Sequence, residues 1–212
     1  MPPLSLPLIF VTAFVVGLSG ALFPGPLLAM NIAETVRRGF WAGPILVGGH
    51  GITEVAMMAA LTLGLSRVLE QTLMAAVIGI GGGLFLLYMS YGLFRTPAQL
   101  PMPGGPSPPL GRNPLMAGAL VSLANPYWFL WWATIGSTYV IWALSLGAAG
   151  LILFYLGHIL SDLSWYSFVS LLISRGRRML SPRVYQGLLR GCGAFLLALG
   201  GYFIYSGVSF LA

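Results

Sequence analysis

Two pairs of histidine and acid residues occur at the same spacing in stretches that are otherwise apolar. His50 precedes Glu54 by four positions, and His158 precedes Asp162 by four. Because four residues make about one helical turn, each pair lies on one face of its helix. Ionisable groups at membrane depth are costly and usually mark a path for an ion, a proton or a substrate. We therefore predict that these residues couple proton movement to transport.

The same four side chains are also an adequate ligand set for a divalent metal, since imidazole and carboxylate groups both bind borderline cations. A metal site formed by His50, Glu54, His158 and Asp162 is therefore the alternative. Asp162 lies nearer the arginine-rich side of its long span, which favours a gate or an interfacial role there. Glu54 is accordingly the better candidate for the proton. We expect no resident cofactor.

A proline-rich motif interrupts the first apolar stretch. Pro24-Gly25-Pro26 lies inside it, after Gly20. Proline removes a backbone donor and disfavours helix at the residue before it, so we expect the helix to break here and to restart. A half-helix N-terminus attracts carboxylates, and unwound carbonyl groups attract cations. The motif is therefore predicted to bind substrate.

The fourth apolar stretch contains a weaker version of this break. Asn125-Pro126 is followed closely by an aromatic cluster that includes Trp128 and Trp132. Such clusters usually form an interfacial belt, but this one lies only a few residues past the break. We therefore include Asn125, Pro126, Trp128 and Trp132 among the predicted substrate-binding residues, with cation–π contacts as one role of the rings.

The composition requires these motifs to lie in a membrane. The chain has 212 residues, of which 58% are hydrophobic and 7% are charged, whereas a soluble domain has roughly 25% charged residues. At about 20 residues per span this predicts an all-α integral membrane protein with six helices and no soluble domain. The expected spans are about 6–33, 41–66, 71–94, 113–136, 142–173 and 186–211.

The two halves of the chain resemble each other in three places, which occur in the same order. The matching features are Pro24 with Pro126, Gly49-His50 with Gly157-His158, and Gly81-x-Gly83 with Gly191-x-Gly193. We therefore predict two three-helix repeats, 1–95 and 113–212, joined by a Pro-rich cytoplasmic linker at 96–112. Three spans are an odd number, so the repeats insert with opposite orientation, as in many secondary transporters.

Arginine predicts the orientation in the bilayer. Every basic side chain is an arginine, and nine of the ten lie in the loops and helix ends after spans one, three and five, while Arg67 lies alone on the other side. By the positive-inside rule, the nine face the cytoplasm and both termini lie outside. The positive charge is a topology signal, and we expect the lipid bilayer rather than nucleic acid as partner.

The cysteine count excludes one class of membrane enzyme. Cys192 is the single cysteine, so the chain cannot form a pair of thiols that relays electrons. We therefore do not expect an enzyme.

At these motifs the sequence resembles the lysine-exporter (LysE-type) family of amino-acid exporters. The resemblance rests on Gly20-x3-Pro24-Gly25-Pro26, Arg38-Gly39-x3-Gly43, Gly48-Gly49-x-Gly51 and Asn125-Pro126. It implies a multi-pass protein of the prokaryotic inner membrane that exports amino acids or similar small metabolites. It also implies coupling to an ion gradient, usually protons, so that the partners are a small-molecule substrate and protons. Related branches move metal cations, which keeps the alternative of a divalent metal exporter, and the oligomeric state is left open.

Overall fold

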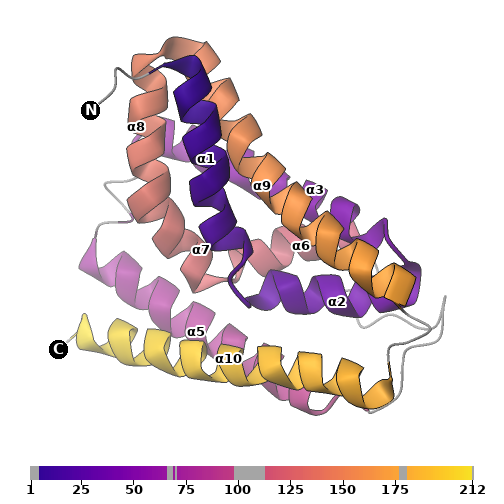
Figure 1. Cartoon of the computed structure of the whole chain (residues 1–212). Coiled ribbons are helices and arrows are strands. Elements are labelled where there is room, and N and C mark those ends of the chain that lie inside the picture. Colours follow the sequence, from indigo (N-terminus) through magenta and orange to yellow (C-terminus); the bar gives the residue numbers. More distant parts are fainter. Residues whose placement is uncertain (1–4, 66–68, 70, 98–112, 177–180, 212) are drawn as a thin grey trace.

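The computed structural model describes residues 5–65, 69, 71–97, 113–176 and 181–211, and the elements assigned in these residues are all helical (Figure 1). This confirms the predicted all-α class. In chain order the elements are α1 (Leu6–Ala21), α2 (Pro26–Arg38), α3 (Ala42–Thr62), α5 (Thr72–Phe94), α6 (Pro114–Leu123), α7 (Pro126–Trp131), the π-helix η2 (Trp132–Gly136), α8 (Ser137–Ser145), α9 (Gly147–Gly176) and α10 (Pro182–Ser209).

Four of these helices, α3, α5, α9 and α10, are long and apolar enough to cross a membrane, and α1 with α2 makes a fifth candidate if the bent pair counts as one span. The fourth predicted span, at 113–136, differs from a simple helix, since its first part, α6, has only 10 residues. The chain is therefore a multi-pass membrane protein, and its arrangement as six spans stays a prediction.

The first predicted break separates α1 from α2, which meet at 78°. Gly25 between them is extended, with φ −90° and ψ −174°, and Pro26 occupies the first turn of α2. Proline suits this position because its missing N–H would have no partner in the first turn. The sequence Pro24-Gly25-Pro26 therefore ends one helix and starts another.

The second break lies between α6 and α7 and is built differently. The Asn125 side chain caps the new helix, with its Oδ1 accepting a hydrogen bond of 3.1 Å from the backbone N–H of Tyr127. Pro126 again fills the first position. The chain then passes through the π-helix η2, which the sequence analysis did not predict.

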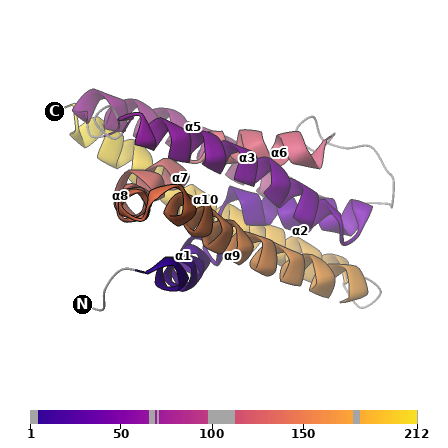
Figure 2. The same ribbon diagram turned by 90° about the horizontal axis from the view of Figure 1, so that it is seen from above.

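Helices from the two halves of the chain pack in pairs. Helix α5 contacts α10, α1 contacts α9, and α3 contacts α6. In Figure 1, α5 and α10 lie side by side along one face, with α1 and α9 on the opposite side. The molecule is not a parallel bundle, because α1 and α8 are seen nearly end-on in Figure 2 whereas α5 and α10 lie across the view.

Glycine allows the closest of these approaches. A Cβ atom on Gly49 of α3 would overlap the carbonyl oxygen of Leu115 in α6, and one on Gly157 of α9 would overlap that of Phe10 in α1. Small residues permit such backbone contact between helices in membranes. These two glycines directly precede His50 and His158, so the contacts that join the helices also place the histidines.

Several sequence predictions concern parts of the chain outside the described residues. Most of the linker at 96–112 belongs to them, as do four of the arginines on which the predicted orientation depends: Arg67, Arg112, Arg177 and Arg178.

Candidate functional site

The two histidine–acid pairs meet in one buried cluster. Glu54 on α3 is at its centre, with its Oε1 3.1 Å from Nε2 of His50 and 2.8 Å from Nε2 of His158 on α9. The shorter contact thus crosses from one half of the chain to the other. Glu54 is 1% exposed, and both histidines are buried. The carboxylate oxygen is therefore held by both imidazoles in a water-poor environment.

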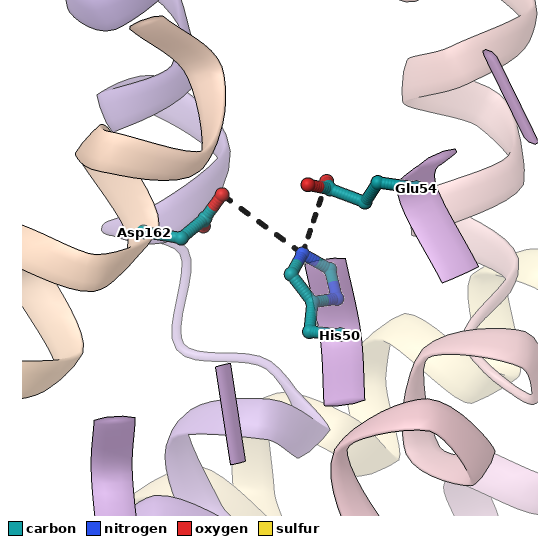
Figure 3. A group of neighbouring side chains, drawn as sticks. All are labelled: His50, Glu54 and Asp162. Carbon is teal, nitrogen blue, oxygen red and sulfur yellow. Dashed lines mark ion pairs between the residues drawn. The ribbon is translucent and has the colours of Figure 1, made fainter. Parts of the chain in front are cut away.

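Asp162 completes this cluster from α9. Its Oδ2 lies 3.9 Å from Nε2 of His50 and 3.8 Å from Nε2 of His158, so it is nearly equidistant from the two rings. These distances exceed those of a hydrogen bond. Figure 3 shows Asp162 and Glu54 approaching His50 from different sides. The aspartate is near enough to interact electrostatically with both rings, but it is not bonded to either.

Ser122 on α6 orients the ring of His50. Its hydroxyl donates a 2.6 Å hydrogen bond to the carbonyl of Gly118, and its Oγ lies 2.6 Å from Nδ1 of His50. Since the single hydroxyl proton is used by Gly118, Nδ1 of His50 must carry the proton of the second bond. The contact between Nε2 of His50 and Oε1 of Glu54 then needs one proton, which is carried by either the ring or the carboxyl.

A cavity of about 60 Å³ adjoins this cluster, which is room for several water molecules. Its walls are formed by α1, α2, α3, α6, α7, η2 and α9, together with the chain at both helix breaks. The lining residues share a position near these breaks or beside the cluster, and they include Gly17, Gly20, Gly25, His50, Glu54, Ser122, Asn125, Trp128, Trp131, Trp132, His158, Asp162 and Tyr166.

Several polar atoms beside the cavity have no hydrogen-bond partner among the described residues. They include Oε2 of Glu54, Oδ2 of Asp162, Nδ1 of His158 and the indole nitrogens of Trp128, Trp131 and Trp132. An unsatisfied buried polar group costs about 1–3 kcal/mol. A cavity with both unpaired acceptors and unpaired donors is therefore chemically suited to a ligand that offers both kinds of group.

The predicted site residues fall into two groups. The ionisable residues His50, Glu54, His158 and Asp162 all line the cavity, and so do Gly25, Asn125, Trp128 and Trp132. The three prolines, Pro24, Pro26 and Pro126, instead form the helix breaks that bring Gly25 and Asn125 to the cavity wall. Asp162 is 4% exposed and lies in the shared cluster.

Sequence reasoning missed Ser122, Trp131, Gly17 and Gly20 as residues of the cavity. Ser122 stands three positions before Asn125, and this proximity to the break was the available signal. Trp131 belongs to the aromatic cluster that the sequence showed, but nothing local distinguished it from its neighbours. Its ring stacks on His158, with centroids 4.5 Å apart.

A cation could be held by part of the cluster. Ligand atoms of His50, Glu54 and Asp162 all lie within 4.8 Å of one another. At present the histidine nitrogens are hydrogen-bonded directly to Glu54. A metal would therefore have to replace the proton between ring and carboxylate.

Apolar helices, two broken helices and a buried site between them define a membrane transporter. A sequence model of the LysE type translocators matches residues 18–207. The chain belongs to this family of transporters, which are not enzymes.

Individual relatives cover much of the chain. A Bacillus subtilis protein named for amino acid efflux is 27% identical over 202 residues, which are 94% of this chain and 97% of that protein. A Pseudomonas aeruginosa protein named for chemotactic transduction is 28% identical and covers 91% of this chain and 96% of its own length. The threonine efflux protein of Escherichia coli K12 is 28% identical over 141 residues, which are 63% of this chain and 67% of that protein. No solved structure matches the chain.

Proposed function

We propose that this transporter exports a small amino acid in exchange for protons. The observation that carries the proposal is the convergence of His50, Glu54, His158 and Asp162 beside a cavity that both helix breaks adjoin. The family and the names of two relatives support an amino acid as substrate. The cavity volume of about 60 Å³ favours a small one.

The substrate lies between the two breaks. Its ammonium group faces the unpaired oxygens of Glu54 and Asp162, which are acceptors without a partner among the described residues. Its carboxylate lies towards the start of α2, where Pro24-Gly25-Pro26 ends one helix and begins the next and where the helix dipole favours negative charge. The wall opposite the start of α2 is formed by Asn125-Pro126, Trp128 and Trp132. Asn125 and both indole rings line the cavity, which supports this placement.

Proton exchange takes place at Glu54. The contact between His50 and Glu54 needs one proton, and His158 offers a second site on the same carboxylate oxygen. A substrate ammonium and a proton both neutralise the carboxylates, so that the two compete for the same cluster. Such competition is the basis of antiport, and one charge moved through 100 mV is worth about 2.3 kcal/mol.

The orientation and the repeat belong to the same proposal. In each of the contacts α1–α9 and α3–α6, the first helix of one half packs against the helix of the other half that carries a histidine–acid pair. The same contact made twice supports two inverted repeats. The arginine-bearing ends of α2, α9 and α10 lie close together at one end of the molecule (Figure 1). This grouping supports a cytoplasmic location for that end in a prokaryotic inner membrane, with both termini outside.

Purified protein in liposomes tests the antiport. Threonine, alanine and serine are offered in turn, and a pH-sensitive dye inside the liposomes reports proton movement. Substrate addition is expected to drive proton flux in the opposite direction, and an imposed proton gradient is expected to drive substrate accumulation. Substrate movement that ignores the gradient would contradict the coupling, and no movement of any amino acid would contradict the substrate class.

Export of a divalent cation is the second candidate, favoured by the closeness of the ligand atoms of His50, Glu54 and Asp162. In that case Zn²⁺ or Mn²⁺ raises the melting temperature of the protein, and both His50→Ala and His158→Ala abolish the rise. This candidate would be rejected if neither Zn²⁺ nor Mn²⁺ changed the melting temperature.

A further inference from the structure

A notch on α1 faces the donor side of the cavity. Gly17 and Gly20 lie about one helical turn apart and both line the cavity. A Cβ on Gly17 would overlap Oγ of Ser161 and lie 2.9 Å from Nδ1 of His158, so these two side chains already fill the space there. A Cβ on Gly20 would meet the indole edge of Trp131 in ordinary contact, 3.6 Å from its Nε1. Nε1 of Trp131 therefore faces the bare backbone of Gly20, where any other residue would place a side chain.

Neither nitrogen has a hydrogen-bond partner among the described residues. Trp131 is 6% exposed and His158 is 5% exposed, so both side chains are buried at the cavity wall. The indole N–H is only ever a donor. The edge of Trp131 that carries this N–H faces Gly20, which makes the notch a place for a group with hydrogen-bond acceptors.

We propose that the part of the cavity lined by Gly20 and Trp131 is a subsite for the substrate carboxylate, and that the N–H of Trp131 donates to one carboxylate oxygen. The inference rests on the proposed amino-acid substrate and adds a specificity-determining residue to it. The helix start at Gly25 lies on the same cavity, so the dipole of α2 and the N–H of Trp131 act on the same negative group.

The two sides of the cavity suit the two charges of an α-amino acid. The acceptors gather around Nε2 of His158, which lies 2.8 Å from Oε1 of Glu54 and 3.8 Å from Oδ2 of Asp162. The unpaired acceptors of Glu54 and Asp162 lie on the Nε2 side, and the donor of Trp131 stacks on the same ring. Ammonium and carboxylate on neighbouring atoms of one small molecule can therefore reach both sides at once.

The test compares threonine with 1-amino-2-propanol, which is threonine without its carboxylate. Binding of both to wild type and to Trp131→Phe is measured by calorimetry in detergent. Phenylalanine retains an aromatic ring beside His158 but has no N–H. The preference of wild type for threonine is expected to fall roughly tenfold or more in the variant, with little change in affinity for the amine.

Gly20→Ala provides an independent variant if Trp131→Phe does not fold. The added methyl would sit 3.6 Å from the indole nitrogen, which is ordinary contact, so that it fills the notch without a clash. Gly201→Ala is the matched control, since a Cβ there meets nothing within 4 Å. The preference for threonine is expected to be lost in Gly20→Ala and retained in Gly201→Ala.

The outcomes separate the subsite from the proposed function. A wild-type preference for threonine that survives in every folded variant of Trp131 and Gly20 overturns the subsite and leaves amino-acid export standing. Wild type that binds threonine no better than the amine also overturns the subsite. Wild type that neither binds nor transports any amino acid overturns both.

Discussion

Nε2 of His158 lies 2.8 Å from Oε1 of Glu54, although the two residues are 104 positions apart in the chain. Glu54 also keeps its contact within the first pair, at 3.1 Å from His50. One carboxylate oxygen thus connects two pairs that the sequence shows as separate. A change in the protonation of Glu54 therefore alters its interactions with His50 on α3 and with His158 on α9 simultaneously.

Glu54→Gln tests whether this carboxylate carries the proton. Glutamine keeps the shape of the side chain and an oxygen that accepts a hydrogen bond, but it cannot exchange a proton. We expect substrate-driven proton flux in liposomes to fall to the level of empty liposomes, while the variant remains folded by circular dichroism. Normal coupled flux in Glu54→Gln would exclude this residue as the proton carrier.

Ser122→Ala removes the partner that fixes the ring of His50. Nδ1 of the buried histidine would then lack a bond, which costs about 1–3 kcal/mol of unfolding free energy. The same change at Ser145, which donates to the carbonyl of Trp142 in its own helix, serves as the control and should cost less than about 1 kcal/mol. Chemical denaturation in mixed micelles measures both, and equal losses would show that the contact with His50 contributes nothing.

Gly118→Ala should separate α3 from α6. A Cβ on Gly118 would overlap the carbonyl oxygen of Leu46, so that the helix backbones must move apart. We expect a loss of about 1–3 kcal/mol in stability, together with weaker proton coupling, because Ser122 and His50 sit on these two helices. Gly92→Ala meets nothing within 4 Å and should instead stabilise the protein by up to about 1 kcal/mol. Similar melting temperatures for the two variants would contradict the packing described for this pair.

Asn125→Ala removes the side-chain cap of α7. The lost bond to the N–H of Tyr127 should cost about 0.5–2 kcal/mol. Since Asn125 also lines the cavity, substrate affinity should fall as well. Asn125→Ser can still cap the helix and should recover most of the stability, as measured by thermal unfolding. A serine variant as unstable as the alanine variant would argue against capping as the role of Asn125.

Local patterns were sufficient to predict the helical class, both breaks and the ionisable residues that line the cavity of the candidate site. Proline at 24, 26 and 126 acts on its own neighbours, and a spacing of four residues fixes a helix face, so each could be interpreted without knowledge of the packing. The pairing of His158 with Glu54 could not be predicted in this way. It depends on how closely α3 and α9 approach, and Gly51 of α3 permits that approach by leaving room for Tyr155 and Ile159 of α9, far away in sequence.

The π-helix and the role of Trp131 were missed for a related reason. In a π-helix each backbone hydrogen bond spans one residue more than in an α-helix, which leaves little trace in the sequence. Residues 132–136 also contain no proline that would indicate a change of helix type. Trp131 is one of several neighbouring aromatic residues, and only the stacking on His158 and the bare backbone at Gly20 distinguish it. Both features arise from tertiary packing, which often overrides local preference.

The sharing of Glu54 between His50 and His158 has a consequence for the history of such a chain. If the halves descend from one duplicated ancestor, that ancestor would have had to assemble as a pair of molecules to build the same cluster. In that case, fusion into one chain would have let each copy diverge, so that one supplies a glutamate and the other an aspartate at the matching position. Neither half could then be removed without dismantling the cluster, because Glu54 comes from one half and His158 from the other.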